Sequence, residues 1–320
     1  MRVMNAVETA EALPYPALIE ALRDMFRSGC EMPLRHHHTV AVPGEPDATL
    51  LLMPAWVPGR YMGVKLVSVF PGNVTRGLPS ISGQYMLSDA TTGAGLALLD
   101  GAVLTARRTA AASALAADYL ARRDAGHLVI VGTGSLSRAL AEAHSQVRPI
   151  RKVTVWGRRA EAAEAVAADL RATLGCEALA TTDLEGAVRR ADIVSAATMS
   201  QTPLVLGEWL AEGCHVDLVG AYKPTMRESD DTAIRRARVH VDTRAGAMKE
   251  GGDIALPLAS GVLSAEAIAG DLYDLTRGLA PGRQTAAEIT LFKSVGAALE
   301  DLAGAILAFE ASTAAKAQTQ

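Results

Sequence analysis

A strand-like segment that leads through a glycine-rich turn into a helix places the strongest constraint on how this chain can fold. Residues 127–131 (HLVIV) are continuously apolar, as expected of a strand buried on both faces. Gly132 and Gly134 follow at once, then the small Ser137, and apolar residues recur at helical spacing through residues 136–147. The first glycine allows a tight turn, the second lets the backbone approach a bound group, and the start of the helix can bind a pyrophosphate. This segment therefore predicts a dinucleotide site, with a structural turn that binds no ligand as the alternative.

A regular alternation of strands and helices continues beyond this turn. A second helical pattern at residues 163–174 ends at Gly175. Strands are expected at residues 127–131, 153–156, 176–180, 192–196, 215–219 and 239–242. Six short strands separated by helices predict an α/β fold with a parallel, doubly wound sheet of the Rossmann type. We assign residues 122–294 to this NAD(P)-binding domain.

The first third of the chain has a different pattern. Helices are expected at residues 17–26 and 105–120, and strand-like runs lie at 38–42, 49–53, 62–70 and 80–87. Strands without helices between them predict an antiparallel or mixed sheet. A helix expected at residues 295–309 has to pack somewhere, and we expect it on this first domain. The predicted second domain is therefore α+β and discontinuous, with residues 1–121 completed by residues 295–320.

The composition argues against several classes of protein. The chain has 320 residues, of which 49% are hydrophobic, so it can bury a core and is not disordered. A net charge of −4 without a basic excess argues against a general nucleic-acid binder. No apolar run reaches the ~18 residues of a membrane span, and no signal peptide is apparent. Three widely spaced cysteines form neither a disulfide framework nor a metal motif. His36, His37 and His38 are expected on a polar strand and not in a metal site. We therefore predict a cytoplasmic protein without a metal.

The end of the second Rossmann strand indicates which dinucleotide is bound. An NAD site usually has an acidic residue there, but this strand is followed by Arg158 and Arg159, and the nearest acid is Glu161. Guanidinium groups suit a 2′-phosphate, so we expect NADP(H) to be preferred and NAD(H) to be possible. The alternative is that both arginines are solvated turn residues. The predicted cofactor-binding set also includes Ser135, Leu136, Thr198, Val219 and Gly220.

Several motifs outside the glycine turn resemble those of one known family. They are GVKLV at residues 63–67, FPGN at 70–73, GLPSIS at 77–82, DATTG at 89–93, LTARRTAA at 104–111, ITLFKSVG at 289–296 and EDL at 300–302. Together they resemble the ornithine cyclodeaminase/mu-crystallin family, and the resemblance extends from about Met32 to Phe309. It implies an N-terminal domain that dimerises through its sheet, a Rossmann domain, and an active site between the two.

The resemblance also implies roles for three basic residues. Lys65 matches the family's active-site lysine, near the nicotinamide and the substrate. Arg108 matches an arginine that holds the substrate carboxylate, and Arg35 matches a second substrate-binding arginine. The residues agree with this, because Arg108 is expected at the start of an alanine-rich helix, where the helix dipole favours a carboxylate. Lys65 lies in an apolar strand, where burial would lower its pKa toward acid–base use; a surface lysine on an edge strand is the alternative.

Four further residues are assigned to the cofactor by the resemblance alone. Ser80 or Ser82 corresponds to a hydroxyl that contacts the cofactor. Ser294 and Gly296 correspond to residues near the nicotinamide.

One departure from the family pattern bears on the reaction. Ornithine cyclodeaminases carry a catalytic aspartate after the fifth Rossmann strand, and Tyr222 occupies that place here. A phenol with a pKa near 10 is a poor base for deprotonating an amine. The sequence therefore looks closest to the ketimine reductases of the family, which reduce 1-pyrroline-2-carboxylate and 1-piperideine-2-carboxylate to L-proline and L-pipecolate. We expect NADPH-dependent reduction of such a cyclic imino acid, with Lys65, Arg108 and Tyr222 at the reacting centre.

Two alternatives remain open from the sequence. If Glu228 or Asp230 supplies the missing base, an ornithine cyclodeaminase or a small L-amino-acid dehydrogenase becomes the better interpretation. A non-catalytic, NADP-dependent binding protein of the mu-crystallin type is the other. Residues 226–228 are expected at the start of a helix rather than in a charged site.

Overall fold

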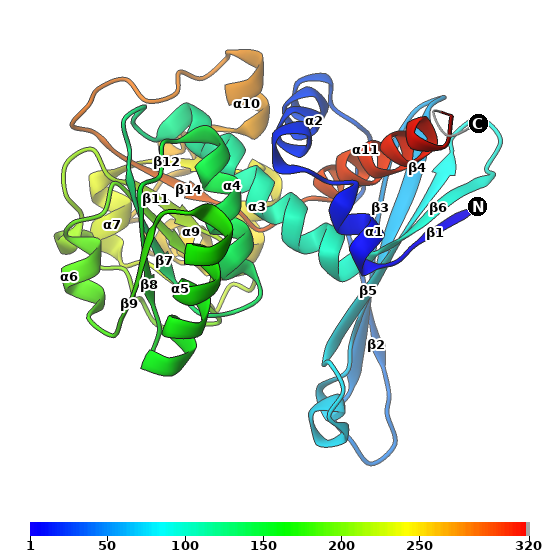
Figure 1. Cartoon of the computed structure of the whole chain (residues 1–320), viewed down its shortest axis with the longest axis horizontal. Helices are drawn as coiled ribbons and strands as arrows, with labels where there is room; N and C mark the ends of the chain where they lie inside the picture. Colours follow the sequence, from blue (N-terminus) through cyan, green and yellow to red (C-terminus); the bar gives the residue numbers. More distant parts are fainter. Residues whose placement is uncertain (318–320) are drawn as a thin grey trace. The chain divides into compact units, whose positions relative to one another are not determined.

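The chain divides into two units, which are described here separately. The computed structural model describes residues 1–317. Unit 1 comprises Met1–Arg108 and the C-terminal segment from Ala298, and unit 2 comprises Thr109–Ala297. In Figure 1, unit 1 contains the blue, cyan and red elements, and unit 2 the green, yellow and orange ones. The division falls inside helix α3 (Gly101–Leu120), whereas the predicted boundary lay at its end, between residues 121 and 122.

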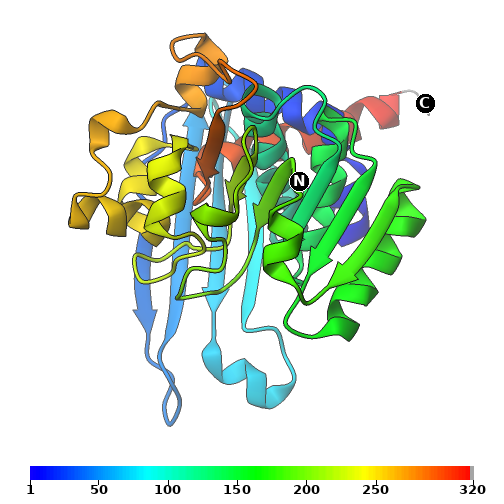
Figure 2. The same cartoon turned by 90° about the vertical axis from the view of Figure 1, so that its left-hand side faces the viewer.

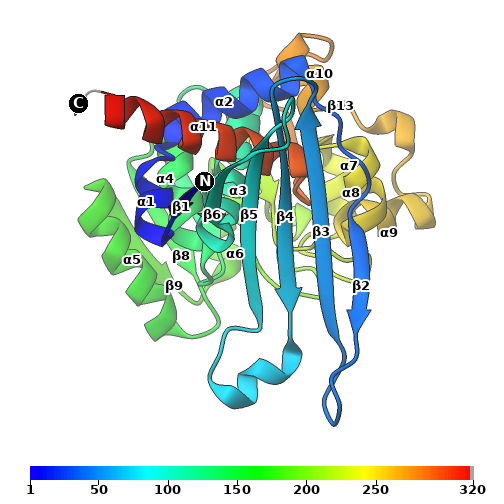
Figure 3. The same cartoon turned by 90° about the vertical axis from the view of Figure 1, so that its right-hand side faces the viewer.

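Unit 1 contains a six-stranded mixed sheet, where the sequence predicted an antiparallel or mixed sheet from four strand-like runs. Its strands lie in the order β1-β6-β5-β4-β3-β2, and Figure 3 shows β2 to β6 side by side. Neighbours pair antiparallel except for β1 and β6, which are parallel. The strands are β1 (Arg2–Met4), β2 (His36–Val40), β3 (Ala48–Val57), β4 (Tyr61–Val69), β5 (Ile81–Asp89) and β6 (Gly95–Asp100). The sequence patterns missed β1, which has three residues, and β6.

The two faces of this sheet differ in what covers them. Helix α11 (Ala298–Ala317) packs against α2 (Tyr15–Ser28) and across β3, β4 and β5. The opposite face leaves apolar side chains in solvent, with Met62, Leu66 and Met86 at 38%, 40% and 41% exposure. Unit 1 is completed by the short elements α1 (Ala6–Glu11) and η1 (Pro71–Arg76).

Helix α11 begins later than predicted. The sequence placed its start at Val295, but Gly296 has a φ of 80°, and the helix begins at Ala298. This left-handed backbone is incompatible with a continuous right-handed helix. Residues 294–296 therefore belong to a turn rather than to the helix.

Unit 2 is built around an eight-stranded parallel sheet, which confirms the predicted α/β, doubly wound class (Figure 2). The strand order is β13-β12-β14-β11-β10-β7-β8-β9. The strands are β7 (His127–Val131), β8 (Lys152–Trp156), β9 (Glu177–Thr181), β10 (Ile193–Ala196), β11 (His215–Leu218), β12 (Ala237–Val241), β13 (Gly270–Asp271) and β14 (Ile289–Lys293). Six of them were predicted, whereas β13 and β14 were not. The order reverses between β7 and β10, which is where open α/β sheets bind their ligands.

Helices on both faces cover this sheet. They are the second part of α3, then α4 (Leu136–Val147), α5 (Ala160–Leu174), α6 (Leu184–Val188), α7 (Asp231–Arg236), α8 (Arg244–Glu250), α9 (Gly252–Ser260) and α10 (Leu272–Arg277), with the short turns η2 (Gly207–Trp209) and η3 (Ala265–Ala267). Helix α5 ends at Gly175 in a left-handed conformation, as predicted. No helix in the described part of the chain is long and apolar enough to span a membrane.

The prediction that residues 226–228 start a helix is wrong. Helix α7 begins at Asp231, because the Asp230 side chain accepts a hydrogen bond from the Ala233 amide and caps the helix there. Residues 226–228 lie in the preceding loop, where Glu228 is fully buried.

Candidate functional site

The glycine-rich turn of unit 2 has the geometry of a dinucleotide cradle. Gly132 has a φ of 120°, and a Cβ there would lie 3.0 Å from the Ala197 carbonyl oxygen. A Cβ on Gly134 would meet nothing within 4 Å, so that glycine faces open space. The Ser137 hydroxyl donates a hydrogen bond of 2.9 Å to the Gly132 carbonyl and ties the first turn of α4 to the loop. The turn is thus held by its own residues and leaves room above the second glycine.

A cavity of about 500 Å³ opens over this turn. It lies over the carboxyl ends of β7, β8 and β10, where the strand order reverses. Its lining comprises Gly132, Thr133, Gly134, Trp156, Gly157, Arg158, Ala197, Thr198, Met199, Ser200, Gln201 and Leu204. Open space above a glycine turn at a helix N-terminus fits the pyrophosphate of a dinucleotide, so these residues would hold that cofactor. Thr133, Trp156 and residues 199–201 were not predicted as cofactor residues, although Thr133 lies in the glycine turn and Trp156 ends a predicted strand.

The other predicted cofactor residues of unit 2 lie at the start of α4, after β11, and between β8 and α5. Ser135 and Leu136 stand at the start of α4, and Val219 and Gly220 follow β11. Arg158 lines the cavity with an exposed side chain, and the exposed Arg159 precedes α5. None of the cavity's lining residues in the described chain is acidic, which leaves Arg158 as its charged side chain.

A buried carboxylate holds the ends of β10 and β11 together. Glu228 Oε1 accepts hydrogen bonds from the Thr198 amide (2.7 Å) and hydroxyl (2.8 Å), and Oε2 accepts from the Gly220 amide (2.7 Å). The pKa of Glu228 is raised to about 7, mainly by burial. Glu228 thus fixes the part of the cavity wall that Thr198 forms. This role of Glu228 was not predicted from the sequence.

Both acids considered as a replacement base accept hydrogen bonds from backbone amides. Both oxygens of Glu228 are hydrogen-bonded, and its side chain is 0% exposed. Asp230 accepts from the amides of Gly207 and Ala233, at 2.8 Å each. Tyr222 is 41% exposed, and the Lys223 ammonium lies 5.7 Å from its ring centre. The loop after β11 therefore presents a phenol, and its two nearby carboxylates are used to hold backbone.

A second buried carboxylate fixes the turn after β14. Asp242 Oδ2 accepts from the amides of Val295 (2.6 Å) and Gly296 (2.7 Å), and the Ser294 hydroxyl lies 3.3 Å away. Burial raises the pKa of Asp242. Ser294 and Gly296, predicted near the nicotinamide, are thus held in one fixed turn.

Unit 1 brings together two of the predicted site residues in a buried charged cluster. Lys65 Nζ lies 2.7 Å from Asp301 Oδ2, and Arg108 Nε donates to Asp301 Oδ1 at 3.0 Å. Arg108 Nη1 donates to Glu300 Oε2 at 2.5 Å. We call Lys65, Arg108, Glu300 and Asp301 the charged quartet; all four side chains are at most 6% exposed.

Strand β4 and helices α3 and α11 position the quartet. Lys65 lies on an interior strand between β3 and β5, not on the edge strand of the alternative interpretation. Burial lowers its pKa to about 8, against the opposing effect of Asp301. The prediction that Arg108 starts a helix is wrong, because α3 already begins at Gly101, where Asp100 accepts from the Val103 amide. Arg108 is therefore held by carboxylates and not by a helix N-terminus.

Glu300 and Asp301 received no role from the sequence, although both belong to a motif of the family resemblance. The signal that could have found them is two adjacent acids in the first turn of an otherwise apolar helix. Two adjacent acids can face a buried surface only where cations pair with them.

The remaining predicted residues of unit 1 lie elsewhere in that unit. The half-buried Arg35 immediately precedes β2, which carries His36 to His38 in an exposed strand. Ser80 precedes β5, where its carbonyl accepts from the Phe70 amide at 2.8 Å, and the exposed Ser82 is the second residue of β5.

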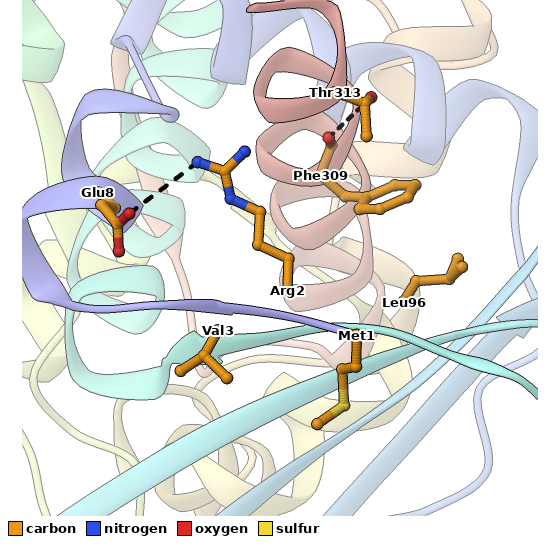
Figure 4. A pocket seen from close by; sticks show the side chains of 7 residues that line it. All are labelled: Met1, Arg2, Val3, Glu8, Leu96, Phe309 and Thr313. Atoms are coloured by element: carbon orange, nitrogen blue, oxygen red, sulfur yellow. Dashed lines mark hydrogen bonds and ion pairs between the residues drawn. The ribbon is translucent and has the colours of Figure 1, made fainter. Parts of the chain in front are cut away.

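A further cavity of about 590 Å³ lies near the N-terminus of unit 1 (Figure 4). Arg2 and Glu8 are 4.0 Å apart there, and the Thr313 hydroxyl donates to the Phe309 carbonyl. Its other lining residues are Met1, Val3 and Leu96, whose side chains carry no ionisable group. We assign it no part in catalysis.

Comparison with known proteins agrees with this geometry. The sequence profile of the ornithine cyclodeaminase/mu-crystallin family matches residues 1–316. The chain is 42% identical over 280 residues to a Delta(1)-pyrroline-2-carboxylate reductase of Paracoccus denitrificans, covering 87% of this chain and 88% of that protein. The Thermococcus litoralis Delta(1)-pyrroline-2-carboxylate reductase, solved with NADH and L-proline, is 33% identical, with a TM-score of 0.91 over 99% of this chain and 98% of that one.

An archaeal alanine dehydrogenase dimer with bound NAD is also similar. It is 29% identical, with a TM-score of 0.89 over 99% of this chain and 97% of that one. The family profile and both solved structures match nearly the whole length of this chain. The chain belongs to the ornithine cyclodeaminase/mu-crystallin family.

Proposed function

We propose that this protein is a nicotinamide-dependent oxidoreductase that reduces the C=N bond of cyclic ketimines, such as 1-pyrroline-2-carboxylate and 1-piperideine-2-carboxylate, to L-proline and L-pipecolate. The observation that carries the proposal is the charged quartet, in which a buried lysine and a buried arginine share Asp301. Two buried cations that share one carboxylate suit a small substrate with its own carboxylate next to the reacting carbon.

Each residue has a role in the proposed reaction. Arg108, assisted by Arg35, binds the substrate carboxylate. Lys65 supplies or retains the proton on the imine nitrogen, and its pKa of about 8 leaves it protonated at neutral pH. A dinucleotide bound over the glycine turn supplies the hydride that adds to the imine carbon. With one hydride on carbon and one proton on nitrogen, the C=N bond becomes a secondary amine.

The loop after β11 supports reduction over cyclodeamination. Cyclodeamination needs a base that removes a proton from an amine, and Tyr222 stands where the family's aspartate would lie. Glu228 and Asp230 are committed to backbone hydrogen bonds and offer no replacement. Retention of Lys65 and Arg108 in one cluster likewise supports catalysis over a binding-only role of the mu-crystallin type.

A preference for NADPH belongs to the same proposal. Arg158 lines the cavity, Arg159 follows it, and the lining residues include no carboxylate to accept from a ribose hydroxyl. Two relatives were solved with NADH and NAD. Use of NADH by this chain is therefore the competing outcome.

We also propose a cytoplasmic homodimer that forms through the exposed face of the six-stranded sheet. Met62, Leu66 and Met86 line that face, and a second copy would remove them from water.

The test follows the absorbance of NADPH and, separately, NADH in the presence of 1-pyrroline-2-carboxylate or 1-piperideine-2-carboxylate. L-Ornithine with NAD, assayed for ammonia, runs beside it. We expect imine-dependent oxidation of NADPH, and a decrease in kcat/KM of about a thousandfold in Lys65→Met. Lys249→Met, which alters an exposed lysine of α8, is the matched control.

Three results would contradict the proposal. Ammonia from ornithine without imine reduction would indicate a cyclodeaminase. Cofactor binding without turnover of either imine would favour a binding protein. Full activity in Lys65→Met would remove Lys65 from the reaction.

A further inference from the structure

The charged quartet is electrically balanced. Lys65 and Arg108 contribute two positive formal charges, and Glu300 and Asp301 contribute two negative ones. Asp301 contacts both cations, with one oxygen on Lys65 Nζ and the other on Arg108 Nε. The site proposed to bind a carboxylate is therefore not a basic pocket.

The other titratable groups around the quartet do not alter this balance. Burial raises the pKa of Tyr85, the cross-strand neighbour of Lys65, well above its ordinary value, so the phenol stays neutral. Burial raises the pKa of Cys30 at the end of α2 to about 11, so this thiol is neutral as well. Glu31 is exposed and screened by solvent. The formal charge of the quartet itself is therefore zero, and the half-buried Arg35, which we propose assists Arg108, is not one of its four members.

A balanced buried site discriminates between ligands by their net charge. Placing an anion in it would leave one uncompensated charge away from water, which is strongly unfavourable. A ligand that carries a carboxylate and a protonated nitrogen adds no net charge, so its two groups can pair with a cation and a carboxylate already present. Such a ligand exchanges ion pairs and creates no unpaired charge.

We propose that Glu300 and Asp301 select the protonated, zwitterionic form of the substrate by balancing Lys65 and Arg108, and that Asp301 is the positioning residue of both cations. The inference rests on the proposed function and deepens it. The ligand class is a small cyclic acid with a positively charged ring nitrogen beside its carboxylate. For a ketimine this is the iminium form, which is also the form whose carbon accepts a hydride.

The test compares two non-reacting ligands of nearly the same shape. L-Proline carries a ring NH₂⁺, whereas tetrahydro-2-furoate has an ether oxygen there and is an anion at neutral pH. Their dissociation constants are measured by titration calorimetry at pH 7 with the full-length protein. We expect the wild type to bind L-proline at least about a hundredfold tighter, equivalent to ~2.7 kcal/mol.

Two variants remove one negative charge each. In Asp301→Asn and Glu300→Gln the quartet carries a net positive charge, and we expect the preference for L-proline to fall at least about tenfold in both. Asp24→Asn removes an exposed carboxylate paired with Arg27 and should leave the preference unchanged. All variants are compared with the wild type by thermal unfolding.

The positioning role of Asp301 has a separate readout. Asp301 opposes the lowering of the Lys65 pKa more strongly than Glu300 does. The alkaline limb of L-proline affinity should therefore move to lower pH in Asp301→Asn, and less in Glu300→Gln. If the alkaline limb of L-proline affinity shifts equally in the two variants, Asp301 has no positioning role beyond its charge.

The outcomes separate this inference from the proposed function. If the wild type binds the two ligands equally well, charge selection is wrong, whether or not the variants fold, while imine reduction stands. If the preference is unchanged in both variants, the quartet does not cause it. If neither ligand binds while NADPH does, the proposed substrate class itself fails.

Discussion

Glu228 in unit 2 and Asp301 in unit 1 are both buried carboxylates, but they pair with different groups. In unit 2, Glu228 accepts from the backbone amides of Thr198 and Gly220, which are fixed parts of the loops after β10 and β11. In unit 1, Asp301 faces the side chains of Lys65 and Arg108. A carboxylate bound to backbone holds the chain in place, whereas one bound to side-chain cations can exchange partners with a ligand.

The difference suggests how to distinguish a structural acid from a functional one. Removing a structural acid leaves N–H groups without an acceptor and should mainly lower stability. Removing a functional acid leaves cations whose charge alters ligand preference. Substitutions in both units and the pH dependence of stability test this distinction.

Replacing Glu228 by alanine should destabilise unit 2. The substitution leaves the Thr198 and Gly220 amides without their acceptor, and each unsatisfied buried donor costs about 1–3 kcal/mol. We expect the free energy of unfolding to fall by about 3 kcal/mol, measured by chemical denaturation. Dinucleotide affinity should fall as well, because Thr198 lines the cavity.

Glu185→Ala is the matched control for this substitution. Glu185 forms an exposed i,i+4 pair with Arg189, so its loss should change stability by less than about 0.5 kcal/mol. An equally small effect of Glu228→Ala would show that the buried carboxylate does not hold the loops.

Two glycines, one in each unit, should respond in opposite ways to alanine. A Cβ on Gly63 would lie 2.6 Å from Tyr85 Cε1, so Gly63→Ala should lower stability by about 2 kcal/mol through overpacking. A Cβ on Gly134 meets nothing within 4 Å, so Gly134→Ala should retain stability but weaken dinucleotide binding. Thermal unfolding and cofactor titration of both variants check this. A stable Gly63→Ala or a Gly134→Ala with normal cofactor affinity would contradict the packing described here.

Glu228 and Lys65 should contribute opposite signs to the pH dependence of stability. The pKa of Glu228 is about 7 in the folded protein, above its ordinary 4.5, so the native state binds more protons and stability falls as pH rises between these values. The pKa of Lys65 is about 8, below its ordinary 10.5, so the unfolded state binds more protons and stability rises over that range. Each slope is at most about 1.4 kcal/mol per pH unit.

Substitution assigns each slope to its residue. Glu228→Gln should remove the acidic slope and leave the alkaline one, and Lys65→Met should do the reverse. Unfolding free energies measured across both ranges decide this, and a slope that survives its own substitution has another origin.

The sequence predicted the architecture of unit 2 better than the charges of either unit. Strand β7, the glycine turn and α4 were predicted at their observed bounds, because each depends on local periodicity and on glycine conformation. Strands β13 and β14 were missed. The first has two residues, and the second was treated as part of a motif and not as a strand.

The partners of the buried charges could not be predicted, because they depend on contacts between distant segments. The sequence alone left Lys65 open between a buried strand and an edge strand, and the pairing of β4 between β3 and β5 decides for the buried one. Asp301 contacts Arg108, although most of the length of the chain separates the two in sequence. Glu228 was expected at a helix start, since nothing local shows that its oxygens meet the loops after two other strands.

The discontinuity of unit 1 has a consequence for how the protein is made. Arg108 and Glu300 are 192 residues apart, so a ribosome adding 5–20 residues per second needs roughly 10–40 s to make the second after the first. During that time the nascent chain carries Lys65 and Arg108 without the carboxylates that balance them. Unit 1 therefore completes its charged core only when the last helix, α11, leaves the ribosome. A message that ends before α11 yields a chain in which these two cations are uncompensated. The quartet is therefore neutral only in a chain that has been synthesised through α11.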